Sequence, residues 1–231
     1  MKPLTEREDY MQELKGGLVV SCQALEDEPL HGNGHMAAMA LAAKQGGAVG
    51  IRANGPRDIL QIKEKVDLPI IGIWKKHYEG YEAFITPTRE DARIVSEAGA
   101  DIIAVDATDQ SRPEKLEELV KYIQDVLGKK VMADISTLSE GKIAESLGCD
   151  YIGTTLSGYT SYTQNRAQPD FSLMKELIQE VSIPVVAEGN IGSPEQAKKA
   201  LEIGAAFVVV GGAITRPQLI TKGFVDGMKA L

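Results

Sequence analysis

One phrase recurs along the chain, and its spacing limits the folds that the sequence can adopt. Each copy contains a helix end, a glycine, a small residue, an apolar strand and a polar exit, in that order. The copies are SEAGADIIAVDAT (96–108), ESLGCDYIGTTLS (145–157), LEIGAAFVVVGGA (201–213) and, more weakly, KQGGAVGIRANG (44–55). The copies lie about twice as far apart as the roughly 25–30 residues of one strand–helix unit in an eight-unit barrel. A second strand should therefore lie between successive copies.

Eight short apolar strands fit this spacing, with helical patterns between them. We expect strands at Gly17–Cys22, Ala48–Arg52, Ile70–Trp74, Ile102–Asp106, Lys130–Asp134, Tyr151–Thr155, Pro184–Ala187 and Phe207–Val210. We expect helices at His35–Lys44, Pro56–Lys65, Arg89–Glu97, Pro113–Leu127, Ser139–Ser146, Phe171–Glu180, Pro194–Ile203 and Gln218–Ala230. This alternation favours a parallel sheet closed as a (β/α)8 TIM-type barrel over an open doubly wound sheet. Because no second domain remains, we expect a single domain over residues 1–231 that begins with a short N-terminal helix.

Composition narrows the class of partner and the compartment. The chain has 231 residues and a net charge of −8, and a typical barrel of this kind takes about 250 residues. The acidic balance, with no basic patch or tail, argues against nucleic acid and anionic membranes as partners. Cys22 and Cys149 are too few for a disulfide framework, which favours a reducing compartment. Neither a signal core nor a membrane-length apolar run is present, so we expect a soluble, cytoplasmic protein.

The segment from Ile183 to Pro217 predicts an anion site. It reads as strand, turn, helix, strand and glycine turn, with Ser193 as a plausible N-cap before Pro194. Both strands end in glycines, at Gly189 and at Gly211-Gly212, where exposed backbone amides can approach an anion. Glu188 stands beside them. The pattern indicates a phosphate cradle with a candidate acid or base next to it.

The predicted strand ends carry an unusual set of polar residues. In a (β/α)8 barrel the chemistry lies at the C-terminal ends of the strands. Charged groups occupy five of the eight ends, and the full set is Gln23, Arg52, Lys75, Asp106, Asp134, Thr154 and Thr155, Glu188, and Gly211-Gly212.

Lys75 is the sharpest candidate for proton transfer. Alternation places it on the same face as Ile71 and Ile73, and places Lys76 on the other face. A buried lysine near other cations has a lowered pKa and can exchange protons with carbon. The alternative is a solvated Lys-Lys pair at the start of a loop. Glu188 has two interpretations as well, an acid/base group or a rim residue in a structural ion pair.

Other candidates also have two interpretations. Arg52 could bind an anion or neutralise a carboxylate, Asp106 or Asp134 could be a salt-bridge member, and Arg216 could form a salt bridge or add a charge to the cradle. SGYTSYT (157–163) opens a long loop that favours a ligand lid. His31 and His35 have a spacing seen in metal sites, but the intervening glycines argue against a shared helix face. We therefore expect a loop there and no metal.

Seven phrases together carry a family resemblance. In order along the chain they are SCQAL (21–25), GIRANG (50–55), PIIGIWK (69–75), MADIST (132–137), IGTTLSGYT (152–160), AEGNI (187–191) and GGAITRP (211–217). They resemble the N-acetylmannosamine-6-phosphate 2-epimerase family over nearly the whole chain. The resemblance implies a phosphate-binding, ribulose-phosphate-binding-like TIM-type barrel. The implied reaction interconverts N-acetylmannosamine 6-phosphate and N-acetylglucosamine 6-phosphate in sialic acid and amino-sugar catabolism, in a homodimer without metal or organic cofactor.

The resemblance also assigns roles to particular residues. The family's catalytic lysine and glutamate fall on Lys75 and Glu188, and its supporting arginine and aspartate fall on Arg52 and Asp134. Further substrate contacts are expected from the backbone or side chains of Gln23, Thr155, Gly189, Asn190, Gly211, Gly212 and Arg216. Asn190 stands where related sequences often have arginine, and Gly212 where they often have serine, so the sequence departs from the pattern at the phosphate end.

Two other functions remain compatible with the glycine cradle. One is a different phosphate-binding barrel, such as another sugar-phosphate isomerase. The second is a non-catalytic phosphosugar sensor, which would keep Gly189, Gly211 and Arg216 but could dispense with Lys75 and Glu188. Because the sequence retains both of these side chains, the sensor is disfavoured.

Overall fold

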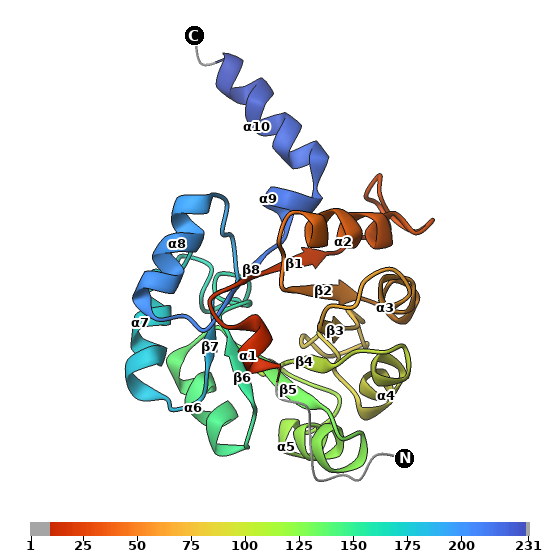
Figure 1. The fold of residues 1–231 in the computed structure, drawn as a ribbon. Helices are drawn as coiled ribbons and strands as arrows, with labels where there is room; N and C mark the ends of the chain where they lie inside the picture. The colour runs from red at the N-terminus through yellow and green to blue at the C-terminus, as the bar shows by residue number, and fades with distance from the viewer. Residues whose placement is uncertain (1–9, 230–231) are drawn as a thin grey trace.

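Eight parallel strands form the centre of the computed structural model, which describes residues 10–229 (Figure 1). They are β1 (Leu18–Cys22), β2 (Gly50–Asn54), β3 (Ile70–Ile73), β4 (Ile102–Asp106), β5 (Lys130–Asp134), β6 (Tyr151–Gly153), β7 (Val185–Val186) and β8 (Val208–Val210). Each strand pairs with its neighbours in chain order, and β1 also pairs with β8. A parallel bridge between Ala187 and Val208 closes the ring. The predicted (β/α)8 barrel is confirmed.

The strands differ from the prediction mainly at their ends. β3 ends at Ile73, β6 at Gly153 and β7 at Val186, each before the predicted last residue, whereas β2 continues to Asn54. These shorter strands leave Lys75, Thr154, Thr155 and Glu188 just beyond the regular sheet. Arg52 lies within β2 and is 1% exposed, so its guanidinium lies inside the barrel and not in a loop.

Alternate strand residues fill the barrel interior. Ile71, Ile73, Ile102, Met132 and Phe207 belong to one buried cluster, which Leu14 of α1 (Met11–Leu14) joins. A separate, larger cluster lies between the sheet and the surrounding helices. The interior is therefore packed with side chains below the polar strand ends, as expected for a barrel of this size.

The remaining helices follow the predicted order. They are α2 (His35–Gln45), α3 (Pro56–Lys63), α4 (Arg89–Glu97), α5 (Leu116–Lys121) continuing into the π-helical turn η1 (Tyr122–Val126), α6 (Leu138–Ser146), α7 (Phe171–Glu180), α8 (Pro194–Ile203), α9 (Gly212–Thr215) and α10 (Pro217–Lys229). The predicted cap of α8 is confirmed, because the Ser193 side chain accepts a hydrogen bond from the Gln196 amide. The fifth helix begins at Leu116 and not at Pro113, since Arg112 bonds the carbonyls of Asp106 and Thr108 and keeps that stretch in a loop.

The last helix departs from the barrel. α10 projects away from the body of the molecule (Figure 1), and none of its residues is buried. Leu219, Phe224 and Met228 are among its exposed apolar side chains. The helical prediction is confirmed through Lys229, while Ala230 and the first nine residues of the predicted N-terminal segment lie outside the described residues.

Candidate active site

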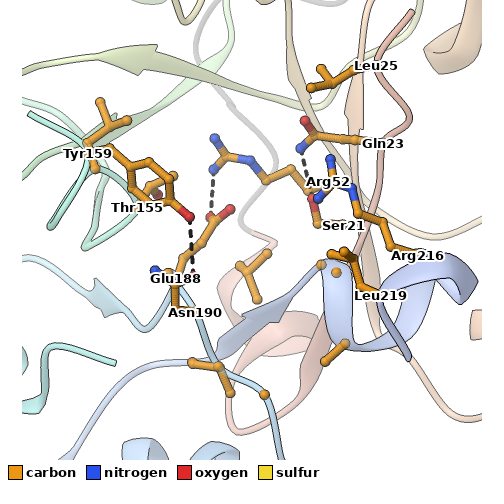
Figure 2. Close-up of a pocket in the computed structure, with 18 of the residues that line it drawn as sticks. Ser21, Gln23, Leu25, Arg52, Thr155, Tyr159, Glu188, Asn190, Arg216 and Leu219 are labelled. Carbon is orange, nitrogen blue, oxygen red and sulfur yellow. Dashed lines mark hydrogen bonds and ion pairs between the residues drawn. The ribbon is translucent and has the colours of Figure 1, made fainter. Parts of the chain in front are cut away.

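A cavity of about 720 Å³ lies at the C-terminal ends of the strands, where the shortened strands expose their polar residues. All predicted site residues except Asp134 line it: Gln23, Arg52, Lys75, Thr155, Glu188, Gly189, Asn190, Gly211, Gly212 and Arg216. These residues come from the ends of six of the eight strands, β1, β2, β3, β6, β7 and β8, and the barrel brings them to a single mouth. Figure 2 shows Tyr159, Glu188 and Asn190 on one side of the cavity and Gln23, Arg216 and Leu219 on the other.

The Arg52 guanidinium joins two carboxylates at the base of the cavity. Its Nη2 lies 2.5 Å from Asp134 Oδ2, its Nη1 lies 3.1 Å from Asp134 Oδ1, and the same Nη1 lies 2.8 Å from Glu188 Oε2 (Figure 2 shows the last contact). Thr155 donates a hydrogen bond to Asp134 Oδ1 at 2.6 Å. Asp134 itself is fully buried. It therefore acts on the cavity through Arg52 and Thr155, and Arg52 neutralises carboxylates as one of its two interpretations predicted.

Burial changes the proton affinity of the two candidate acid/base groups in opposite directions. Burial raises the pKa of Glu188 to about 7; the Arg52 charge opposes this rise and the Asp134 charge adds to it. Burial and the Arg52 charge lower the pKa of Lys75 to about 8, against the opposing effect of Glu188. Burial also disfavours the charge of Arg52, but the two carboxylates raise its pKa above the ordinary value. Near neutral pH, Lys75 and Glu188 can each both give and take a proton.

The two adjacent lysines have different environments. Lys75 lines the cavity, whereas the Lys76 amine lies 3.0 Å from Asp91 Oδ1 and 4.4 Å from the centre of the Trp74 ring. The alternation predicted from the strand pattern therefore separates them, and the alternative of a solvated pair does not describe Lys75.

The two glycine turns both line the cavity. Gly189 and Asn190 have φ values of 112° and 53°, so the chain turns sharply after Glu188. The opposite turn begins α9, whose Thr215 hydroxyl donates to the Ser21 carbonyl at 2.9 Å and ties the helix to β1. The amides in the first turn of a helix have no carbonyl one turn earlier to bond. The amides of Gly212 and Ala213 are therefore suited to an anion.

Arg216 forms a salt bridge, which is one of its two interpretations from the sequence. It lines the cavity, and its Nε and Nη2 lie 2.5 Å and 3.0 Å from the two carboxylate oxygens of Glu28. This hydrogen-bonded pairing with Arg216 lowers the pKa of Glu28. Sequence reasoning missed Glu28 because it lies in the acidic loop after β1, where no periodicity marks it and its partner is distant in the chain.

Ser21 and Tyr159 line the cavity as well, and neither was predicted as a site residue, whereas Gln23 was. Ser21 accepts a hydrogen bond from Gln23 Nε2 at 2.8 Å, and Gln23 Oε1 is buried with no partner among residues 10–229. Tyr159 belongs to the loop predicted as a lid, and its hydroxyl lies 3.3 Å from Asn190 Oδ1. The strand-end pattern marks Gln23, and the polar aromatic loop marks Tyr159. Asp106, by contrast, lies outside the cavity and accepts from Thr108.

Within the described part of the chain, no cluster of three or more His, Cys, Asp or Glu side chains is arranged to hold a metal ion. His31 lies instead in a loop, with Nδ1 3.1 Å from the Ala24 carbonyl oxygen. Across residues 10–229, no helix combines the length and apolar character needed to cross a membrane. The cavity lining itself offers one amine, one carboxylate, two guanidiniums, and hydroxyl, carboxamide and backbone groups.

Comparisons with known proteins agree with one another. A family model described as "Putative N-acetylmannosamine-6-phosphate epimerase" matches residues 36–230. A relative named "Putative N-acetylmannosamine-6-phosphate 2-epimerase" from Caldanaerobacter subterraneus subsp. tengcongensis is 55% identical over 224 residues, which are 96% of this chain and 94% of the relative. A relative of the same name from Oceanobacillus iheyensis is 54% identical over 220 residues, 93% of this chain and 99% of the relative.

Solved structures extend the comparison. The N-acetylmannosamine-6-phosphate 2-epimerase from Clostridium perfringens is 51% identical with a TM-score of 0.92, and the match covers 96% of this chain and 97% of that one. A thiamine phosphate pyrophosphorylase from Pyrococcus furiosus, 20% identical with a TM-score of 0.60 over 90% of both chains, shares the fold alone. On this identity and coverage, the chain belongs to the N-acetylmannosamine-6-phosphate epimerase family.

Proposed function

We propose that this protein interconverts N-acetylmannosamine 6-phosphate and N-acetylglucosamine 6-phosphate by removing and replacing the proton on C2. The observation that carries the proposal is the placement of Lys75 and Glu188 in one cavity, with pKa values brought to about 8 and about 7. Family membership supplies the substrate. The glycine turns that line the cavity supply a place for its phosphate.

The chemistry requires an open-chain sugar. Ring opening gives an aldehyde, which makes the C2 hydrogen acidic because it lies next to a carbonyl. A base then takes the C2 proton, and the electron pair of the C–H bond moves into the carbonyl to give an enolate, with the negative charge on the C1 oxygen. Returning a proton to the opposite face of C2 gives the epimer. The site must therefore supply a base, an acid and positive charge near the enolate oxygen.

The cavity residues divide between these tasks. Lys75 and Glu188 act as the acid/base groups at C2, and Arg52, held by Asp134, supplies positive charge. Gln23 and Thr155 contact the sugar, since both line the same cavity as Lys75 and Glu188. The backbone around Gly189, Asn190, Gly211 and Gly212 receives the phosphate, with Arg216 nearby. All of these steps use side chains and backbone of this chain.

The direct test is turnover of N-acetylmannosamine 6-phosphate in D2O, followed by NMR of the sugar. We expect both epimers to form, with solvent deuterium at C2. Failure to form either epimer from either sugar would contradict the proposed function, and a panel of other phosphosugars would then identify the substrate. Binding with thermal stabilisation but without turnover would indicate a sensor.

Lys75→Ala tests the assigned acid/base group. The variant should fold and show essentially no epimerisation, because it lacks the amine that exchanges a proton with C2. Lys76→Ala is the matched control, since the Lys76 amine pairs with Asp91 outside the cavity. It should retain wild-type turnover. Near-normal activity of Lys75→Ala would remove Lys75 from the mechanism.

We further propose that the chain forms one barrel domain and functions as a homodimer through α10. Solvent exposes 72% of Phe224 and 73% of Met228 on this projecting helix, and apolar side chains gathered on one element favour association. A phosphosugar substrate and free buried thiols at Cys22 and Cys149 suit a reducing interior, so we place the protein in the cytoplasm. Cell fractionation tests the location.

A further inference from the structure

Lys75 and Glu188 occupy equivalent positions in two different strand pairs. In a parallel pair of strands the hydrogen bonds alternate in direction. When the amide of one residue donates to the carbonyl of residue j on the other strand, the amide of residue j+2 donates back to the carbonyl of that same residue. The last regular bond between β2 and β3 runs from the Gly55 amide to the Ile73 carbonyl at 2.8 Å. The last one between β6 and β7 runs from the Thr154 amide to the Val186 carbonyl at 3.2 Å. Position j+2 is Lys75 in the first pair and Glu188 in the second.

In both pairs a side chain takes the place of the next ladder bond. The Lys75 amide donates to Asn54 Oδ1 at 2.8 Å, and the Glu188 amide donates to Thr154 Oγ1 at 3.2 Å. The Thr154 hydroxyl also donates to the Glu188 carbonyl at 2.8 Å, so it holds both backbone groups of Glu188. The backbone carbonyl of the preceding strand would otherwise be the acceptor, and the chain would continue as regular sheet.

Neither side chain belongs to the catalytic cavity. Thr154 is 1% exposed, and Asn54 lies in the wall of a neighbouring cavity that shares Lys75. A Cβ at Gly189 would lie 3.3 Å from the Thr154 carbonyl oxygen, which shows how closely the turn after Glu188 passes over Thr154. Their contacts therefore act on the backbone of the acid/base residues and not on a bound sugar.

Lys75 has additional support that Glu188 lacks. Thr86, fully buried with φ 46°, accepts from the Trp74 amide and donates its own amide to the Trp74 carbonyl. A β-branched residue with positive φ is held in a strained conformation. This strain persists directly beside the candidate acid/base residue. Loss of the Asn54 contact should therefore displace Lys75 less than loss of the Thr154 contact displaces Glu188.

We propose that Thr154 and Asn54 are positioning residues that aim Glu188 and Lys75 at C2 by replacing the next ladder bond of their strands. This inference rests on the proposed function, because it assigns a catalytic purpose to the placement of these two side chains. The geometry of proton transfer is sensitive, and a displacement of about 1 Å can cost about 100-fold in rate.

Thr154→Val tests the proposal, since valine keeps the shape of threonine and removes the hydroxyl. We expect kcat to fall about tenfold with KM within about twofold, because only the reacting geometry is disturbed. Thr154→Ser should restore most of the rate. Asn54→Leu should lower kcat by about threefold, the smaller effect following from the other contacts that hold Lys75.

Asp101→Ala is the matched control, because the Asp101 side chain also accepts a hydrogen bond from a strand amide. Asp101 Oδ2 accepts from the Ile70 amide at 2.9 Å at the opposite end of β3. The variant should melt at a lower temperature and keep the wild-type kcat. Three outcomes would overturn the positioning role. They are a wild-type kcat in Thr154→Val, a kcat in Thr154→Ser as low as in Thr154→Val, and a Thr154→Val chain that does not fold. Because wild-type turnover is measured first, failure of the proposed function would be seen separately.

Discussion

At the scale of residues, Lys75 and Glu188 hold their protons in one shared environment. Burial brings the pKa of Lys75 down to about 8 and that of Glu188 up to about 7, so the two groups titrate close together. Epimerisation needs one proton on the pair, because one group must accept a proton from C2 while the other gives one. Below about pH 7 both groups are protonated, and above about pH 8 neither is.

The pH dependence of kcat should therefore be a narrow bell with its maximum between about pH 7 and pH 8. The acid limb reports uptake of the second proton by Glu188, and the alkaline limb reports loss of the proton from Lys75. We would measure kcat and not kcat/KM, because a phosphate monoester has its own pKa near about 6. A rate that stayed flat between the ordinary pKa values of about 4.3 and about 10.4 would contradict this picture.

Asp134→Asn should move this whole bell to lower pH. The Asp134 charge raises the pKa of Glu188 and that of Lys75, so its removal lowers both, and kcat at the optimum should fall because Arg52 loses a charged partner. Asp106→Asn is the control: Asp106 is the register partner of Asp134 and is also buried, but its partners are Thr108 and Arg112, whereas Asp134 pairs with Arg52. Its pH optimum should match wild type, and an equal shift in both variants would refute a specific role for Asp134.

At the scale of elements, the phosphate end can be tested through α9. A Cβ at Gly212 would meet Leu219 Cδ1 at 3.5 Å and Arg216 Cδ at 3.7 Å, which are ordinary van der Waals contacts. The glycine is therefore not required by space, and a serine side chain fits at the first residue of the helix.

Gly212→Ser should bind the phosphosugar more tightly, because its hydroxyl adds a donor beside the cradle. One hydrogen bond contributes about 0.5–1.5 kcal/mol, which lowers KM by about twofold to tenfold. Gly212→Ala adds the Cβ without the hydroxyl and should leave KM unchanged, which steady-state kinetics on the three proteins would show. An unchanged or raised KM in Gly212→Ser would place the phosphate elsewhere.

The sequence predicted which elements exist better than where they end. Recurring apolar segments located all eight strands, because a buried parallel strand must be apolar on both faces. The predicted end of β6 at Thr155 was two residues too late, since the Thr154 side chain takes over the bonds to the next strand. Such a contact depends on residues 34 positions apart, and a local pattern does not contain it.

At the scale of the whole molecule, the barrel determines which predicted residues meet. The rule that chemistry lies at strand ends predicts Arg52, Lys75 and Glu188 as site residues from the sequence pattern alone. It did not reveal the pairing of Arg216 with Glu28, 188 positions apart. Nor could the helical pattern of α10 show what that helix packs against, because periodicity describes a face and not its partner.

The position of α10 links assembly to the cavity. Its first turns contribute Leu219, Ile220 and Gly223 to the cavity lining, while Phe224 and Met228 lie further along the helix and are exposed. A second copy that covers the outer part of α10 would therefore also fix its inner part. Because Leu219 lies next to Gly212, this inner part borders the phosphate end and not the acid/base pair.

The double substitution Phe224→Glu with Met228→Glu should convert a dimer into a monomer of 24.9 kDa, since two buried charges at an apolar contact are unfavourable. We expect KM to rise about fivefold with kcat changed by less than about twofold, because the phosphate end loosens while Lys75 and Glu188 stay in place. Light scattering after gel filtration measures the mass, and steady-state kinetics measure KM and kcat.

Lys222→Ala is the control on the same helix, where the lysine pairs with Asp226, and it should remain dimeric. Wild-type protein that runs as a monomer would refute the dimer, and a monomeric variant with unchanged KM would separate assembly from phosphate binding.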